Sequence, residues 1–424
     1  MHEISQLPNG LRIVTHTMKE TESVTVNIFV GAGGRYENMK TEYGASHFLE
    51  HLLFKGTHKR PSAKQISEEI DSVGGYLNAF TAEDHTSYYI KLPKNYFGLA
   101  FNILADIITD PLFEQVEIDR ERNVILEEMK VYKDDPARYV YDLVGDLLWP
   151  SDALRTNVIG NEQIISTMQR QTIVNYFRDL YTMGNIIVSV AGNVSHQTVL
   201  EMAQKLLWQV PPKSHRTWQP VHGGLSKQRY SLERQETNQT HLVVVGRAPR
   251  IDADDEAAMK LLSTILGSGM SSRLFLNVRE NKGLAYTVYM SYSNFVDSGK
   301  FEIYAGVNND KVGEALKAIH EELQKIQREK VSLRELNKAK EQVRGRYIMG
   351  QEGNAAVADM QGTQMVLSDK VDSLTQILAK LDSVNEDNIL EAAKKYLYKD
   401  LVRLAVIGPF DDADVAKFSK LLEE

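Results

Sequence analysis

The chain contains no cysteine among its 424 residues. A chain without cysteine has no disulfide framework and no thiolate that could act as a nucleophile or bind a metal. Any metal site in this protein must therefore be built from histidine and carboxylate side chains.

Excess positive charge and long apolar runs are also missing. The 49 basic and 57 acidic residues give a net charge of −8, so no nucleic-acid partner is expected. No apolar run reaches the length that spans a membrane, and no membrane association is expected. The first residues, MHEISQLPNGLRIVTH, lack the apolar core of a signal peptide and the arginine-rich pattern of a transit peptide. We therefore expect a cytoplasmic protein.

The overall composition is typical of a globular protein, with 42% hydrophobic and 25% charged residues. A chain of this length is expected to form two or three domains. Apolar residues alternate along 24–30, which predicts a strand, and 74–93 predicts two neighbouring strands joined by a polar turn. Helices are predicted over 62–70, where Ser62 and Gln65 suggest a capping box, and over 113–133.

The two halves of the chain follow the same plan near their ends. Segments 166–207 and 382–423 each predict a helix, a strand, a glycine turn and a last helix. Three pairs of residues match at a constant offset of 216: Ile173 with Ile389, Gly192 with Gly408, and Leu206 with Leu422. A constant offset over about forty residues indicates an internal duplication.

The duplication predicts two homologous domains of α+β class, each a largely antiparallel sheet packed against helices. We place the first domain at 1–212 and the second at 225–424. The stretch 210–224 is rich in Pro, Gly and His, and its residues 213–224 are predicted to be the linker between the domains.

The stretch GASHFLEHLLFKGT, residues 44–57, contains two histidines four positions apart. On a helix, His47 and His51 lie on one face and Glu50 lies beside them. This H-x-x-E-H order is typical of a group of zinc peptidases. The alternative is a core helix that carries two structural histidines.

The second half helps to choose between these alternatives. At an offset of 215 the three polar residues correspond to apolar residues: His47 to Leu262, Glu50 to Ile265, and His51 to Leu266. A helix position that the fold requires would be apolar in both copies. Polar residues in one copy alone favour a function, and we expect a metal site in the first domain.

Catalytic zinc is normally held by three protein side chains. The third ligand is expected in the acidic helix within 119–135 or just before it. Four glutamates there are candidates, and spacing alone does not choose among them: Glu117, Glu121, Glu127 and Glu128.

These motifs resemble those of the pitrilysin/insulinase family of zinc peptidases. HFLEHLLFKGT followed by ERNVILEEM is similar to its short-chain branch, which includes mitochondrial processing peptidase and its bacterial relatives. LPNGLRIV, LNAFTAEDHTSYY and GSGMSSRLFLNVRENKGLAYTV extend the resemblance along the whole chain. The chain departs from the family at Glu127, where relatives often have Arg, and at SDALRTNVIG, where they often have His-Pro-Leu-Gly.

The resemblance implies a set of metal ligands. The family has its third ligand 77 positions after the second histidine, which gives Glu128. One Zn²⁺ per chain would then be held by His47, His51 and Glu128. Glu121 would support the ligands from outside the metal sphere, and Glu50 would be the general base.

The resemblance also implies how substrate is handled. Arg279 and Tyr286 of the second domain would take part in catalysis by stabilising the reacting carbonyl oxygen. An exposed edge strand would hold an extended peptide through Asn78, Ala79 and Phe80.

The expected function is a zinc metalloendopeptidase that cleaves extended, unstructured peptides or presequences. Longer family members close four such domains around the substrate, so this two-domain chain is expected to form its chamber as a homodimer. Each active site would then combine residues from two subunits. The alternatives are an inactive scaffold or partner subunit, and an oligopeptide-binding protein that retains zinc.

Overall fold

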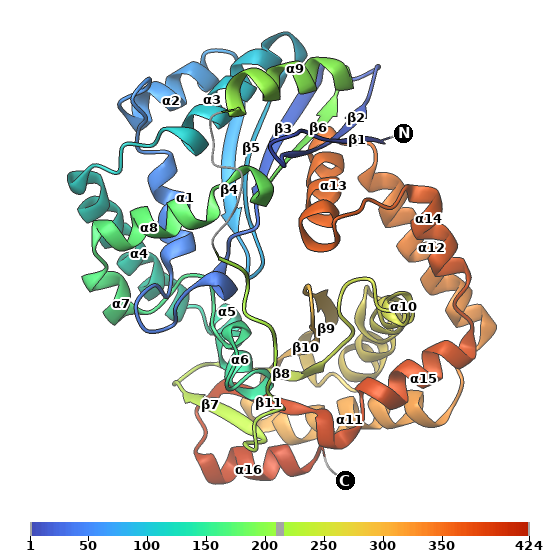
Figure 1. The fold of residues 1–424 in the computed structure, drawn as a ribbon. Helices are drawn as coiled ribbons and strands as arrows, with labels where there is room; N and C mark the ends of the chain where they lie inside the picture. The colour runs from blue at the N-terminus through green and yellow to red at the C-terminus, as the bar shows by residue number, and fades with distance from the viewer. Residues whose placement is uncertain (1, 209–215, 423–424) are drawn as a thin grey trace. The chain divides into compact units, whose positions relative to one another are not determined.

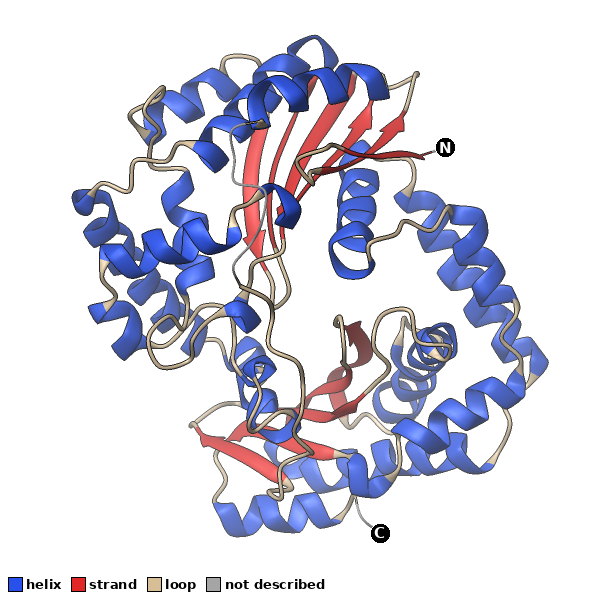
Figure 2. Ribbon diagram, viewed as in Figure 1, coloured by secondary structure: helices blue, strands red, loops and turns tan. Residues whose placement is uncertain are grey.

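The computed structural model describes residues 2–208 and 216–422. The chain forms two compact units, and each unit is assembled from three separate segments. The first unit contains 1–130, 157–219 and 348–373, and the second contains 131–156, 220–347 and 374–424. Each unit has its own mixed sheet and helices (Figure 2).

The first unit is built on a six-stranded sheet in the order β1-β2-β6-β3-β5-β4. Its strands are β1 (His2–Gln6), β2 (Arg12–Thr17), β3 (Ser23–Val30), β4 (Tyr76–Thr81), β5 (Thr86–Pro93) and β6 (Ile186–Gly192). Neighbouring strands are antiparallel except for β2 and β6, which are parallel. Strand β4 therefore lies at one edge of the sheet.

Helices cover both faces of this sheet (Figure 1). The helices of the first unit are α1 (Ala45–Leu53), α2 (Ala63–Asp71), α3 (Phe97–Thr109), α4 (Gln115–Lys133), α7 (Glu162–Thr167), α8 (Arg170–Leu180), α9 (His196–Leu207) and α13 (Asn354–Ser368). Most pack around one large core on one face. Helix α13 packs on the other face, against β2, β3 and β6. The last residues of α4 belong to the second unit.

The second unit repeats the arrangement with a five-stranded sheet in the order β7-β11-β8-β10-β9. Its strands are β7 (Tyr230–Arg234), β8 (Gln239–Arg247), β9 (Ala285–Asn294), β10 (Gly299–Asn308) and β11 (Arg403–Gly408). Its helices are α5 (Pro136–Tyr139), α6 (Asp142–Leu148), α10 (Glu256–Gly267), α11 (Val312–Arg328), α12 (Leu333–Gly350), α14 (Leu374–Asp382), α15 (Glu386–Tyr396) and α16 (Asp412–Lys420). Strands β7 and β11 are parallel, and β9 is the edge strand that corresponds to β4.

Each half of the sequence contributes helical segments to the unit that is built mainly from the other half. Helix α6 comes from the first half but packs on the sheet of the second unit, against β7, β8 and β11. Helix α13 comes from the second half but packs on the sheet of the first unit. A side chain at Gly362 of α13 would come within 1.9 Å of the Phe29 ring, so this glycine permits the close contact between helix and sheet.

The predicted fold class is confirmed, because each unit is a largely antiparallel sheet packed against helices. Strand β3, the hairpin of β4 and β5, and helices α2 and α4 form where the sequence pattern predicts them. Ser62 caps α2 by accepting a hydrogen bond from the Gln65 backbone N–H at 3.3 Å. The duplicated ends also match, as α8-β6-α9 and α15-β11-α16.

The predicted division at 1–212 and 225–424 does not show the exchange of helices. The local sequence pattern of a helix does not reveal which distant sheet the helix packs against. Residues 213–215 of the predicted linker lie outside the described residues. One of the points at which the chain passes between the units, Gln219–Pro220, lies within that linker. In residues 2–208 and 216–422, no helix combines the length and apolar character needed to cross a bilayer.

Candidate metal centre and active site

Helix α1 presents the H-x-x-E-H residues on one face. It begins after Gly44, which has φ of 96° and so adopts a left-handed conformation that favours glycine. Its other face is apolar and buried in the core of the first unit, through Phe48, Leu49, Leu52 and Leu53. Burial of this face directs the half-buried side chains of His47, Glu50 and His51 to the opposite side.

The structure distinguishes among the four glutamates that the sequence offers as candidates for the third metal ligand. Glu117 pairs with Arg120 at 2.6 Å, and Glu127 pairs with Lys130 at 2.7 Å, so both are engaged along α4 itself. Glu121 and Glu128 both approach α1, because residues seven apart lie on the same face of a helix. Glu128 is the one that reaches both histidines.

His47, His51 and Glu128 form a compact group of potential metal ligands. One ligand atom from each lies within 4.8 Å of the others. A Glu128 carboxylate oxygen is 3.9 Å from His47 Nε2 and 3.7 Å from His51 Nε2. The two imidazole rings stand nearly edge to face, with centroids 4.7 Å apart. The two nitrogens and the oxygen therefore converge on one point.

The electrostatics of this group suit a divalent cation. Burial, followed by the neighbouring His51, lowers the pKa of His47 to about 3, so its ring is neutral at neutral pH. Neutral imidazole is the form that binds metals. Two imidazoles and one carboxylate are a donor set of catalytic zinc sites, in which a fourth position stays open. The residues present therefore fit zinc.

Glu50 lies beside the group without belonging to it. Its carboxylate accepts a hydrogen bond of 2.5 Å from the Thr81 hydroxyl, at the end of β4. Burial raises the pKa of Glu50, while this hydrogen bond acts in the opposite direction. A carboxylate with a raised pKa, held next to a metal site, is suited to accept and return a proton.

Glu121 supports His51 from behind. Its carboxylate lies 3.1 Å from His51 Nδ1, which leaves Nε2 free to face Glu128. The other Glu121 oxygen pairs with Lys55 Nζ at 2.8 Å, and the glutamate side chain is buried. A carboxylate on the outer nitrogen of a ligand histidine fixes the ring orientation and its tautomer.

Strand β4 carries the three residues predicted to bind peptide. It pairs with β5, and among the described residues no strand covers its other edge. The backbone N–H of Ala79 donates to the Asn78 side-chain oxygen at 2.9 Å, and the Asn78 amide donates to the Tyr76 hydroxyl at 2.7 Å. Phe80 instead packs edge to face on His85, with ring centroids 5.7 Å apart. Their roles in substrate binding stay predictions.

Arg279 and Tyr286 lie together in the second unit. The Arg279 guanidinium is 6.0 Å from the centre of the Tyr286 ring and 4.7 Å from that of Phe275. Tyr286 is the second residue of β9 and is 74% exposed, so it has little structural role in its own unit. The catalytic role of this pair stays a prediction.

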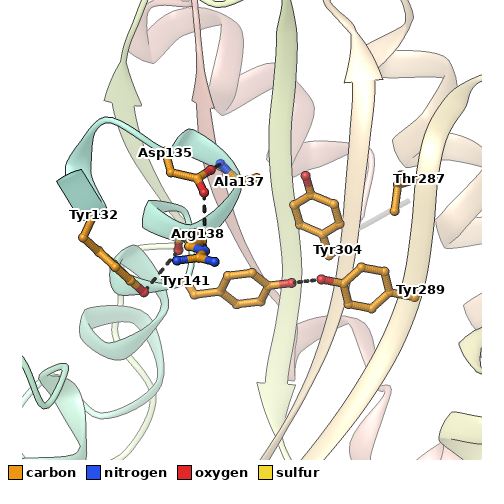
Figure 3. A pocket seen from close by; sticks show the side chains of 8 residues that line it. All are labelled: Tyr132, Asp135, Ala137, Arg138, Tyr141, Thr287, Tyr289 and Tyr304. Atoms are coloured by element: carbon orange, nitrogen blue, oxygen red, sulfur yellow. Dashed lines mark hydrogen bonds and ion pairs between the residues drawn. The ribbon is translucent and has the colours of Figure 1, made fainter.

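The second unit also contains a cavity of about 660 Å³ between α5 and the sheet (Figure 3). It is lined by Tyr132, Asp135, Ala137, Arg138, Tyr141, Thr287, Tyr289 and Tyr304. Its polar groups are largely engaged with one another. The Tyr141 and Tyr289 hydroxyls are 2.7 Å apart, and Asp135 caps α5 and lies 3.4 Å from Arg138.

Helix α10 is the counterpart of α1 in the second unit, because each packs against the edge strand of its sheet. The residues that correspond to the H-x-x-E-H positions are all buried in the core: Leu262, Ile265 and Leu266. The expectation of an apolar counterpart helix is confirmed.

Sequence reasoning missed three residues that contact the site or its helix. Thr81 donates to Glu50, Lys55 pairs with Glu121, and Glu37 binds the start of α1. Thr81 directly follows the predicted peptide-binding residues, and Lys55 lies one helical turn beyond His51. These positions could have suggested their roles. Glu37 gives no such local sign.

Two family models match the chain. The model described as insulinase, peptidase family M16, matches residues 12–162, which include the whole group of potential ligands. The model described as the peptidase M16 inactive domain matches residues 167–343. The H-x-x-E-H motif lies in the segment matched by the insulinase model and does not occur in residues 167–343, which match the inactive-domain model.

Proteins of similar sequence cover nearly the whole chain. A Bacillus subtilis protein named an uncharacterized zinc protease is 32% identical over 405 residues, which are 95% of this chain and 97% of that protein. A Streptomyces coelicolor protein of the same description is 35% identical over 419 residues, or 97% and 90%. A Rickettsia felis protein, also named an uncharacterized zinc protease, is 35% identical over 411 residues, or 96% and 98%.

Solved structures share the fold. A protease from Helicobacter pylori has a TM-score of 0.90 at 24% identity and covers 96% of this chain and all of its own. A structure from Pseudomonas fluorescens, titled peptidase M16 inactive domain, has a TM-score of 0.89 at 18% identity, with coverages of 97% and 98%. At these identities the likeness supports the fold alone.

Proposed function

Because the chain belongs to the insulinase family of M16 peptidases, we propose that it is a zinc metalloendopeptidase. The proposal rests chiefly on one observation, the convergence of His47, His51 and Glu128 within 4.8 Å with Glu50 beside them. These three residues would hold one zinc ion per chain. Relatives at 32–35% identity that are named zinc proteases support the choice of metal.

The side chains around the metal would divide the chemistry among them. Zinc, when bound, supplies a Lewis acid that polarises the scissile carbonyl and acidifies water. Glu50 would take the proton of the attacking water and deliver it to the leaving amine. The Thr81 hydroxyl would hold the Glu50 carboxylate in place, and Glu121 would keep His51 in the tautomer that presents Nε2.

The second unit would contribute to the same reaction. A negative charge develops on the carbonyl oxygen as water attacks, and a fixed hydrogen-bond donor lowers the energy of that state. Arg279 and Tyr286 are exposed donors that lie side by side, which suits this role. An exposed arginine and tyrosine also have the freedom to meet a substrate.

The proposed substrate is an extended, unstructured peptide or presequence. An incoming peptide could pair with the outer edge of β4 through main-chain hydrogen bonds, with little dependence on its own side chains. The Asn78 side chain occupies the Ala79 N–H at this edge, so it would move aside when a peptide strand binds. Broad sequence tolerance follows from this mode of binding.

We further propose that the chain acts as a homodimer that encloses the substrate in the cytoplasm. Each active site would use His47, Glu50, His51 and Glu128 of one subunit. Arg279 and Tyr286 would come from the other subunit. The alternative, an inactive scaffold or partner subunit, is disfavoured because the ligand set and Glu50 are complete.

The test of peptidase activity is cleavage of an unstructured fluorogenic peptide by the purified full chain and by Glu50→Gln. Loss of the general base is expected to lower kcat roughly 100- to 10,000-fold. Zinc content should stay unchanged, because Glu50 is not among the proposed ligands. Equal cleavage by the variant and the wild type would contradict the proposed mechanism.

The test of the shared site is to mix Glu50→Gln subunits with Arg279→Ala subunits. Each variant alone should be nearly inactive. A mixed dimer contains one site with all groups intact, so mixing should restore up to about a quarter of wild-type activity if subunits exchange at random. If exchange is verified and activity stays at the level of the single variants, the shared-site proposal is wrong.

A further inference from the structure

The start of helix α1 is bound by a buried carboxylate from a preceding turn. Glu37 accepts hydrogen bonds from the backbone N–H groups of Gly44 and Ser46, both at 2.8 Å, and from the Ser46 hydroxyl. Its side chain is fully buried. Both carboxylate oxygens are therefore engaged with the first turn of the helix that carries His47 and His51.

Capping a helix with a buried carboxylate carries a desolvation cost that a cap on the protein surface would not have. A helix is more often capped by a serine or aspartate at the position before it, whose side chain accepts the N–H of the second or third helical residue. In α1 that position is Gly44, which has no side chain, and the capping group comes from seven residues earlier. Burial raises the pKa of Glu37, whereas its three hydrogen bonds act in the opposite direction.

The second unit shows that the fold does not require such a cap. In the described structure, no side chain caps the N-terminus of α10, although α10 packs against the edge strand as α1 does. Glu256, in the first turn of α10, instead accepts the backbone N–H of Asp252 and the side-chain amide of Asn294. The buried carboxylate cap and the metal-ligand group thus occur together, in one unit of the two.

We propose that Glu37 is a positioning residue that fixes the rotation and register of α1, and through them the geometry in which His47 and His51 meet the metal. This inference rests on the proposed zinc site. Helix α1 has only nine residues, and its functional face is polar. A helix of this length is marginally stable in isolation, so its position depends on the contacts that hold it, and Glu37 adds one at its first turn.

A metal site tolerates only small displacements of its ligand atoms, so the position of α1 must be held closely. Ligand atoms of α1 lie roughly 5–6 Å from the helix axis. A rotation of about 10° would therefore move them by about 1 Å, whereas metal–ligand distances are held to within about 0.2 Å. Two N–H groups fixed on one carboxylate oppose such a rotation, because both hydrogen bonds would lengthen.

The test compares Glu37→Gln with Glu256→Gln, a matched change at the start of α10. Glutamine keeps the size of the side chain but replaces one acceptor oxygen with a donor, so one N–H group of α1 loses its partner. We expect Glu37→Gln to weaken zinc binding at least tenfold, measured by competition with a chromophoric chelator. The visible absorption of the Co²⁺-substituted protein should change, and kcat should fall with KM within about threefold. Glu256→Gln should leave all of these unchanged.

Thermal unfolding of both variants without metal provides the structural readout. Zinc binding is measured at a temperature well below the lower of the two unfolding midpoints. If Glu37→Gln lowers the unfolding midpoint but leaves zinc affinity and the Co²⁺ spectrum at wild-type values, Glu37 is only a structural cap and the proposal is wrong. If Glu37→Gln does not fold, Ser46→Ala, which removes one of the three hydrogen bonds, decides by the same criteria. A wild-type protein that binds no zinc would instead overturn the proposed function itself.

Discussion

Helices α1 and α10 occupy equivalent places in the two units but differ in what they present. Both pack an apolar face into a core beside the edge strand of their sheet. In α10 the second face is also buried and apolar, whereas in α1 it carries His47, Glu50 and His51. The fold therefore needs only an apolar helix at this place. The polar residues of α1 are an addition in one copy, and they replace core packing with a group that can bind a metal.

The sharpest way to remove this difference is to give α1 the residues of its counterpart. The triple variant His47→Leu, Glu50→Ile, His51→Leu should abolish zinc binding, a loss of at least 1,000-fold in affinity, because one ligand remains. Apolar packing in place of half-buried polar groups should also raise the free energy of unfolding of the apo protein by about 1–3 kcal/mol. Isothermal titration with Zn²⁺ and urea unfolding measure the two effects. A less stable variant would show that these polar residues belong to the fold.

The converse change removes core packing from α10. Leu266→Ala truncates a fully buried side chain and should cost about 2–5 kcal/mol of stability. Zinc affinity should stay within about twofold of wild type, because this helix carries no ligand. Urea unfolding with a parallel zinc titration measures both. A large loss of zinc affinity in the folded variant would show that α10 is not merely structural.

A smaller effect is expected from Glu121, which contacts His51 without reaching the proposed metal position. Glu121→Gln should weaken zinc binding roughly 10- to 100-fold, because the His51 ring loses a charged partner that orients it. Chelator competition measures the change. Glu127→Gln on the exposed face of α4 is the matched control and should have no effect. Equal affinities for both variants would exclude the supporting role of Glu121.

The smallest expected effect concerns the turns beside the two edge strands. His85 is buried next to Phe29 and Phe80, and burial lowers its pKa to about 4. The folded pKa lies below the ordinary value of 6.5, so stability is complete above pH 6.5 and declines as the pH falls toward 4. At pH 5.5 the protonation of His85 in the unfolded chain should lower the free energy of unfolding by roughly 1 kcal/mol.

The corresponding turn of the second unit contains a buried phenylalanine, Phe295, which does not titrate. His85→Phe should therefore remove part of the loss of stability between pH 6.5 and 5.5. Urea unfolding of the zinc-free protein at both pH values measures it. An unchanged pH dependence would show that other groups account for the effect.

The sequence was sufficient for the parts of the site that depend on helical spacing. The four-residue interval places His47 and His51 on one face, and the seven-residue interval places Glu121 and Glu128 on one face of α4. The duplication predicted two related sheets and an apolar counterpart to α1. The choice of Glu128 among four glutamates needed the family resemblance, because each of them fits a solvent-exposed helix equally well.

Contacts between distant segments could not be predicted in this way. The exchange of α6 and α13 between the halves depends on which sheet face each helix covers, and both helices have ordinary local patterns. Thr81 reaches Glu50 from the end of β4, and this contact depends on the packing of α1 against that strand. Glu37 binds α1 only because the turn that contains Glu37 folds back on the start of this helix.

The most direct test of the central claim is a zinc titration of chelated, metal-free protein in which bound metal and peptide cleavage are recorded together. The site in the first unit predicts that cleavage is absent without metal and returns in proportion to binding, with an end point of one Zn²⁺ per chain. Cleavage that persists in the metal-free protein would contradict the account. So would full occupancy without cleavage of any unstructured peptide, which would favour a scaffold or partner subunit.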